Sequence, residues 1–300
     1  EATCTAVGER LYSCACGYSY TEEIPTAEHN YITTINAPTD TQDGNKYDTC
    51  DDCGEVANEE IIWGINSLNF PDEAFRNYVE ATYNTDDEVG LCETEVAAAT
   101  SITITADVEA ENLYGIELFT SLETLVVESS YVQEIDVSSN AELSTLTVSS
   151  ATGLTTLNCS YTALSSLNAD GLNNLTTINA TYCSNMYSLS AQNCSSLSDV
   201  DASYSSISNA YFNDSANLTS LNLAYARQLQ RLQLMNCTGL TRDVSADVHS
   251  ADITECGINS QDGYLIIKVT GTEIESRYSE VFGTTCVYGS GGYSYQGFEP

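Results

Sequence analysis

The chain has 300 residues, an ordinary apolar share of 42%, and an extreme formal net charge of −35. All eight lysines and arginines lie outside residues 77–226. This excludes nucleic acids and anionic membranes as partners, because both require cationic contacts to phosphate. No run approaches the ~18 apolar residues that a membrane-spanning helix requires, so we expect no membrane span.

Cysteine usage indicates the compartment. Twelve cysteines in a chain with so few basic residues favour an oxidising setting, outside the cell or at its surface. The sequence begins at Glu1 with neither Met nor an apolar leader, which we interpret as a processed secreted form or an excised fragment.

Residues 1–60 form a small segment rich in cysteine, threonine and tyrosine. Its two halves look like degenerate copies: residues 1–17 end in Cys-Ala-Cys-Gly, and residues 37–54 end in Cys-Asp-Asp-Cys-Gly. The pattern resembles the Cys-x-x-Cys-Gly repeats that occur in tandem in large surface proteins of Gram-positive gut bacteria.

Each copy departs from a full set of metal ligands. The first has Cys-Ala-Cys in place of Cys-x-x-Cys, and the second has Asp40 where the first has Cys4. A structural zinc site requires four well-placed ligands, so these departures argue against zinc. They favour disulfides that stabilise a segment too small for its own core. The pairing is unassigned among five cysteines: Cys4, Cys14, Cys16, Cys50 and Cys53.

Residues 61–114 predict a helical cap. The helix should start near Pro71, with acidic residues in its first turn, and present Phe75, Tyr78 and Val79 on one apolar face.

An acidic loop follows this helix. Counted as a twelve-residue calcium loop, it places ligands at the first, third, fifth and twelfth positions, which are Asn84, Asp86, Glu88 and Glu95. Glycine falls at the seventh position instead of the sixth, where such loops turn sharply. The alternative is a solvated acidic loop that binds no ion.

From residue 122 to 240 the chain repeats the phrase apolar-x-x-apolar-x-apolar every 10 or 11 residues. Two phrases make a unit of 21 or 22 residues, as in leucine-rich repeats, with one short strand and one return segment per unit. Residues 115–245 therefore predict a repeat solenoid of short parallel strands with little helix. The fourth residue of each phrase should be buried: Leu125, Ile135, Leu146, Leu157, Leu167, Ile178, Leu189 and Val200.

The order of these parts carries a second resemblance. Asn-Phe-Pro-Asp-x-x-Phe-Arg-x-Tyr-Val at residues 69–79, the acidic loop, and Gly-Ile-Glu-Leu-Phe-Thr-Ser-Leu-Glu-Thr-Leu at residues 115–125 precede the repeats. The arrangement resembles the internalin-related leucine-rich-repeat surface proteins of Firmicutes, over about residues 61–244. The resemblance implies a secreted or wall-associated binding protein without catalytic activity, and it names no ligand.

Strand alternation should turn the fifth and eighth residues of each phrase outward. In alternate phrases these columns hold Asn158, Asn179, Asp201 and Asn222, and Tyr161, Tyr182, Tyr204 and Tyr225. A row of aromatic rings beside amides suits sugar rings and is the predicted ligand-binding site. The alternative is that the tyrosines only stabilise the ladder. The intervening phrases look like plain solvated return segment.

Residues 246–300 lack the repeat and predict a C-terminal cap. Residues 263–270 should form a strand, and the flanking Cys256 and Cys286 are expected to form a disulfide.

Two functional classes remain. The sequence shows no nucleophile–histidine arrangement and no phosphate loop, so we expect no enzyme. One class is a surface adhesion protein that binds a glycan or a surface protein. The other is a subunit of an extracellular fibre or surface layer, in which the chain associates with itself.

Overall fold

The computed structural model describes residues 1–85, 89–223, 225, 226, 228, 229, 231–234, 236, 237 and 239, and the strand residues 243–246, 266–268, 287–288 and 293–294. Within these residues, no helix is both long and apolar enough to cross a membrane. Contacts divide the chain into an N-terminal unit, Glu1–Asn69 with Asn84–Glu95, and a solenoid unit, Phe70–Tyr83 with Val96–Pro300. The four-segment division expected from the sequence stays a prediction.

The N-terminal unit consists of antiparallel strands rich in Tyr, Thr and β-branched residues, which favour strands. β1 (Gly8–Ser13) pairs with β2 (Ser19–Ile24). A separate sheet has the order β3 (Tyr31–Asn36), β4 (Gly44–Cys50), β5 (Val56–Trp63), β6 (Leu91–Cys92). The described part of the N-terminal unit buries few apolar side chains: Cys4, Cys50, Ile62 and Leu91.

The solenoid unit begins with the predicted helix, which is confirmed as α1 (Glu73–Tyr83). The Asp72 carboxylate caps it by accepting the Phe75 N–H at 2.9 Å. Phe75 and Val79 are buried, and the ring of Phe75 packs edge-on against Phe70 at 5.9 Å. After α1 come α2 (Glu93–Ala98), which crosses the boundary between the units, and then β7 (Ser101–Ile104) and the 3₁₀ helix η1 (Ile116–Leu118).

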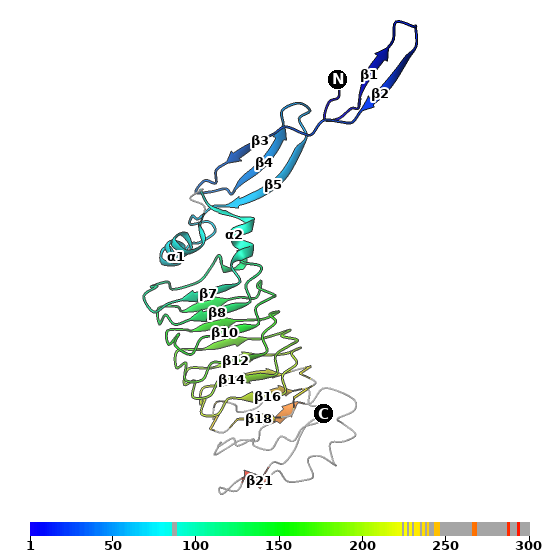
Figure 1. Cartoon of the computed structure of the whole chain (residues 1–300). Coiled ribbons are helices and arrows are strands. Elements are labelled where there is room, and N and C mark those ends of the chain that lie inside the picture. The colour runs from blue at the N-terminus through cyan, green and yellow to red at the C-terminus, as the bar shows by residue number, and fades with distance from the viewer. Residues whose placement is uncertain are drawn as a thin grey trace. The chain divides into compact units, whose positions relative to one another are not determined.

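The repeats form a solenoid of parallel strands, as predicted (Figure 1). One sheet has seven strands in the order β20-β19-β17-β15-β13-β11-β9, a second has the order β12-β14-β16-β18, and a third has the order β10-β8-β7. The bounds are β8 (Thr124–Val127), β9 (Glu134–Asp136), β10 (Thr145–Thr147), β11 (Thr156–Asn158), β12 (Ser166–Asn168), β13 (Thr177–Asn179), β14 (Ser188–Ser190), β15 (Asp199–Asp201), β16 (Asn209–Tyr211), β17 (Ser220–Leu223), β18 (Arg231–Gln233), β19 (Asp243–Ala246) and β20 (Ile266–Lys268).

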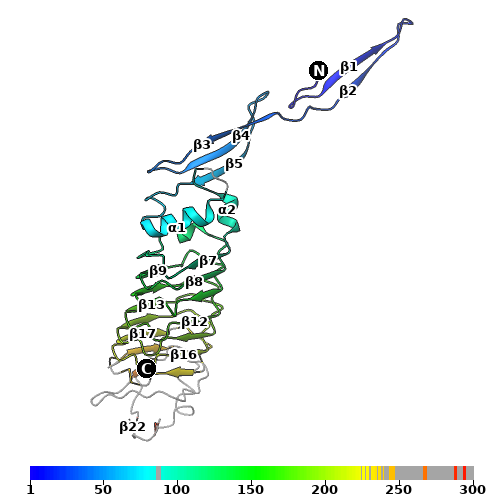
Figure 2. The ribbon, with the colours of Figure 1, turned by 60° about the vertical axis from the view of Figure 1, so that its left-hand side comes forward.

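The structure differs from the sequence analysis in the segments expected to be plain return segment. These segments also form strands, so each 21- or 22-residue coil carries two, one on each of two faces (Figures 1 and 2). The reason is that alternate phrases have the same apolar spacing. Leu164, Leu167 and Ala169 are buried around β12 just as Leu154, Leu157 and Cys159 are around β11.

The core is formed by the inward side chains of both faces. All eight residues predicted to be buried are at most 7% exposed. Equivalent residues stack in register, so that Leu157 lies between Ile135 and Ile178 of the neighbouring strands.

The ninth residue of a phrase, Asn or Cys in the leucine-rich-repeat consensus, joins one coil to the next. The buried Asn140 amide donates to the carbonyls of Ile116 and Phe119 at 2.9 and 3.0 Å. Buried cysteine side chains, which are shorter than asparagine, make the same kind of bond: the Cys237 thiol donates to the Phe212 carbonyl at 2.9 Å. Each of these carbonyls also accepts a backbone N–H within its own turn, so the side chain adds a second bond that links neighbouring coils.

At the C-terminal end, the predicted strand is present as β20, which pairs in parallel with β19. The two short strands β21 (Val287–Tyr288) and β22 (Tyr293–Ser294) pair with each other. The expected disulfide between Cys256 and Cys286 lies outside the described residues.

Candidate functional site

The tyrosine ladder consists of Tyr161, Tyr182, Tyr204 and Tyr225, one ring per coil. The rings follow strands of the seven-stranded sheet and are 42–58% exposed. Their backbone is left-handed, with φ between 58° and 61°. This conformation is an outlier for a bulky residue with a Cβ atom.

The opposite edge of the coil has the same backbone but different side chains. From residue 171 onward, the eighth residues of the intervening phrases also have positive φ, and they are Gly171, Asn193, Asp214 and Asn236. Gly, Asn and Asp are the residues that tolerate the left-handed region best. From Tyr161 to Asn236 each half coil therefore has a left-handed residue at this position, and only one edge uses tyrosine for it.

The rings of the ladder stack face to face. Successive centroids are 4.8, 4.8 and 4.4 Å apart, and the planes differ by 5–16°. Each inner ring thus has both faces covered by its neighbours, so it presents its edge and its hydroxyl group to solvent. Burial, followed by the neighbouring phenols Tyr225 and Tyr182, raises the pKa of Tyr204 above its ordinary 10.0, so its hydroxyl stays a donor at neutral pH.

The polar column beside the ladder positions the turns that carry the tyrosines. It consists of Asn158, Asn179, Asp201 and Asn222. The Asn158 side chain accepts from Ser160 through its oxygen and donates to the Asp136 carboxylate at 3.0 Å. The same local bond to the amide two residues later is made by Asn179 and Asp201. Asn222 donates to Asp201 at 2.9 Å. These four predicted site residues are half-buried, and their bonds hold the backbone that presents the tyrosines.

Of the predicted calcium ligands, the structure describes Asn84 and Glu95, while Asp86 and Glu88 lie outside the described residues. The Glu95 carboxylate accepts from the Thr85 N–H at 2.6 Å and the Cys92 N–H at 3.1 Å. The second bond is the reciprocal half of a capping box at the start of α2. Glu95 therefore has a structural role with or without an ion, and calcium binding stays a prediction.

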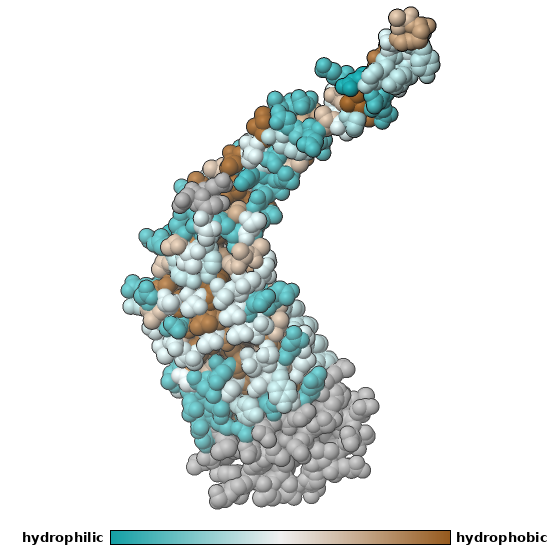
Figure 3. Space-filling view, viewed as in Figure 1, coloured by the Kyte–Doolittle hydropathy of each residue, from teal (hydrophilic) through white to brown (hydrophobic). Residues whose placement is uncertain are grey.

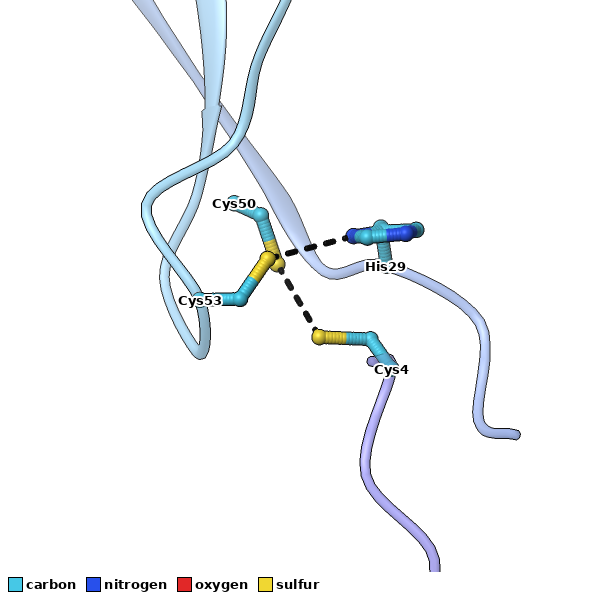
Figure 4. Close-up of side chains that lie close together, drawn as sticks. All are labelled: Cys4, His29, Cys50 and Cys53. Atoms are coloured by element: carbon cyan, nitrogen blue, oxygen red, sulfur yellow. Dashed lines mark hydrogen bonds between the residues drawn. The ribbon is translucent and has the colours of Figure 1, made fainter. Parts of the chain in front are cut away.

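The cysteine–histidine cluster consists of Cys4, His29, Cys50 and Cys53 (Figure 4). One ligand atom from each residue lies within 4.8 Å of all the others. Cys50 ends β4 and Cys53 lies in the turn after it, while His29 comes from the segment before β3 and Cys4 from the segment before β1. Cys4 and Cys50 are buried. No single copy contains four ligands, but the fold brings together Cys4 of the first copy, Cys50 and Cys53 of the second, and His29 from the segment between the copies.

The two buried thiols of the cluster differ in acidity. Burial, together with hydrogen bonds to Cys53 and Cys50, raises the pKa of Cys4 to about 12. Burial opposes ionisation of Cys50 as well, but hydrogen bonds from the Cys53 backbone and the His29 ring lower its pKa to about 6. Two other cysteines of this unit, Cys14 and Cys16, are not in the cluster, because they form a disulfide with each other in the β1–β2 turn.

Comparisons with known proteins add little. No family model matches the chain, and no curated protein is significantly similar to it in sequence. Among solved structures, the functional domain of InlJ from Listeria monocytogenes, which includes a cysteine ladder, is similar at a TM-score of 0.23 and 16% identity. That comparison covers 71% of this chain and 63% of the InlJ chain, so this chain spans less than two thirds of the InlJ domain.

Internalin C2 from the same organism is similar at a TM-score of 0.24 and 14% identity, over 63% of this chain and 96% of the other. These TM-scores are too low to carry an argument. The leucine-rich-repeat solenoid is therefore assigned from its own strand pairing and repeat spacing.

Proposed function

We propose that the protein is a non-catalytic binding protein of the cell surface or extracellular space, and that the tyrosine ladder is its binding surface. The observation that supports this most directly is the use of tyrosine, four times in succession, at a left-handed backbone position where the other edge uses Gly, Asn or Asp.

Ring stacking alone does not account for this choice. A left-handed residue with a Cβ atom costs about 1–2 kcal/mol. A stacked aromatic pair contributes about 0.5–1.5 kcal/mol beyond the area it buries. Asn would adopt the same backbone with less strain, as Asn193 and Asn236 do. A ring retained against this cost, and turned toward solvent, is best explained by contact with a partner.

The surroundings of the ladder indicate the chemistry of that partner. Residues 122–226 carry nine acids and no base, and their outward positions are chiefly Ser, Thr, Asn and Tyr. The view of Figure 3 shows pale and teal side chains over much of the solenoid, with limited brown patches. Such a surface offers hydrogen bonds without a strong positive field. A neutral, hydroxyl-rich glycan fits it best, contacted by ring edges and phenol hydroxyls, and a polar protein surface is the second kind of partner.

The test distinguishes three contributions of the ladder: the aromatic rings, their hydroxyl groups, and the stability that the rings give the protein. In Tyr182→Asn/Tyr204→Asn, the backbone keeps residues that accept the left-handed turn, and in Tyr182→Phe/Tyr204→Phe the stack remains but two hydroxyls are lost. A matched control replaces two exposed tyrosines outside the ladder, Tyr131→Asn/Tyr187→Asn. Binding is measured on glycan arrays and on immobilised surface proteins, and stability by thermal melting.

We expect the Asn double variant to lose at least tenfold in affinity while the control binds like the wild type. Loss of affinity in the Phe double variant would assign recognition to the hydroxyls. Undiminished binding by the Asn double variant would mean that the binding site lies outside the ladder. A large drop in melting temperature without any ligand found for the wild type would make the ladder a scaffold feature.

The alternative function is a subunit of a fibre or surface layer. The rings are 4.8 Å apart, and a second copy of the solenoid packed alongside would present rings at the same spacing. Filaments of the wild-type chain in negative-stain images, absent from the Asn double variant, would favour this function over ligand binding.

A further inference from the structure

We propose that Cys4, His29, Cys50 and Cys53 bind one Zn²⁺ ion in a closed tetrahedral site that stabilises the N-terminal unit. The four side chains come from three separate segments and point toward a common centre (Figure 4). This convergence is the observation on which the proposal depends.

The distances between the groups are those of a zinc coordination shell. With Zn–S bonds of about 2.3 Å and Zn–N bonds of about 2.0–2.1 Å, two sulfurs of a tetrahedron lie about 3.8 Å apart, and a sulfur and a nitrogen about 3.6 Å. The Cys4 and Cys50 sulfurs are 3.8 Å apart, and the Cys53 sulfur is 3.5 Å from His29 Nδ1.

A second layer of contacts orients the ligands. His29 Nε2 lies 3.1 Å from the Glu55 carboxylate, which leaves Nδ1 directed into the cluster. A carboxylate on the far nitrogen of a ligating histidine is a frequent outer partner in zinc sites. The turn that carries two of the cysteines is closed by the Gly54 N–H donating to the Cys50 carbonyl at 2.8 Å. Gly54 has φ of 76°, which a residue without Cβ adopts at no steric cost.

Other roles leave part of the cluster without an explanation. A disulfide between Cys4 and Cys50 would use two of the four groups and leave Cys53 and His29 beside it. A nucleophilic set of Cys53, His29 and Glu55 would use only two of the four groups. It would leave the buried thiols of the other two cysteines facing the same point. A metal ion uses all four groups, and three thiolates with one imidazole in a tetrahedron favour zinc over calcium or magnesium.

The N-terminal unit also needs such a crosslink. Its buried apolar residues are few, while Leu11, Ile32, Ile35 and Val56 are 49–68% exposed. Small units of this kind commonly depend on a metal or a disulfide for stability. A zinc ion here would join Cys4 to Cys50 across 46 residues of chain. Binding replaces the thiol protons of the three cysteines, which pass to solvent.

The test uses the full chain, purified under reducing conditions without chelator. Elemental analysis should find one zinc per chain, and Co²⁺ in its place should give the tetrahedral ligand-field bands and the thiolate-to-cobalt charge-transfer band of a site with several sulfurs. Cys50→Ser and His29→Ala should lose the metal or these bands. Cys92→Ser removes a free thiol of the same unit outside the cluster and should retain both.

Glu55→Gln tests the outer partner without removing a ligand. It should still bind one zinc but with 10–100-fold lower affinity in competition with a chromogenic chelator. Circular dichroism of the solenoid serves as a folding control for every variant. The proposal is overturned if zinc content is equal in the wild type and Cys50→Ser. It is also overturned if mass spectrometry finds a Cys4–Cys50 disulfide that forms equally with and without zinc.

Discussion

Removing one side chain from the middle of the solenoid tests the assignment of the core. Leu157 is fully buried in β11, between Ile135 of β9 and Ile178 of β13. Leu157→Ala leaves a cavity that the neighbouring coils cannot fill, because their own side chains are fixed in register. Such substitutions cost about 2–5 kcal/mol.

This cost should be a large part of the total free energy of unfolding, since folded proteins are stable by only about 5–15 kcal/mol. In a solenoid each coil contacts only its two neighbours, so a defect in a central coil weakens two interfaces at once. Leu157→Asp is harsher, because it buries an unpaired charge, and we expect it to prevent cooperative folding.

Urea unfolding followed by circular dichroism measures the effect. With an m-value of about 2 kcal/mol/M, a loss of 3 kcal/mol lowers the midpoint by about 1.5 M. The control is Thr156→Ala, an exposed position in the same strand, which should change stability by less than about 0.5 kcal/mol. Equal midpoints for Leu157→Ala and Thr156→Ala would refute the in-register core.

Two further predictions concern the N-terminal unit. If the loop from Asn84 to Glu95 binds calcium, the melting temperature of the chain should rise with calcium but not with magnesium, because bound ion stabilises only the folded state. Identical curves would leave the acidic-loop interpretation. Hydrogen bonds from Asn58 and then Thr33 lower the pKa of Asp48 below its ordinary 3.8. The stability from Asp48 is therefore present above pH 3.8 and is lost as the pH falls through the lower folded-state pKa, and Asp48→Asn should remove this dependence in acid-unfolding curves.

The sequence predicted the core because a fixed period determines which side chains point inward. It did not reveal the second strand of each coil, although the signal was present: Leu164 and Leu167 repeat the spacing of Leu154 and Leu157. The assignment of one strand per unit came from the leucine-rich-repeat pattern and not from the residues themselves.

The candidate sites were predicted in part. The ladder of rings was predicted from the period, but not its left-handed backbone, because tyrosine gives no local sign of positive φ. The same period predicts stacked rings at about the strand spacing of 4.8 Å, and the structure has them 4.4–4.8 Å apart. The cysteine–histidine cluster was missed because its residues come from two motif copies and from the segment between them, and their convergence depends on strand packing that no local spacing encodes.

The register shared by strands, rings and buried donors limits how the solenoid can change in length. Insertion of one residue into a strand would turn every later side chain of that strand to the other face. Insertion or loss of a whole coil of 21 or 22 residues keeps every column aligned and changes the ladder by one tyrosine. The number of rings in the ladder, and with it the valency of the proposed binding surface, can therefore vary in unit steps, by duplication or deletion within the gene, without any redesign of the fold.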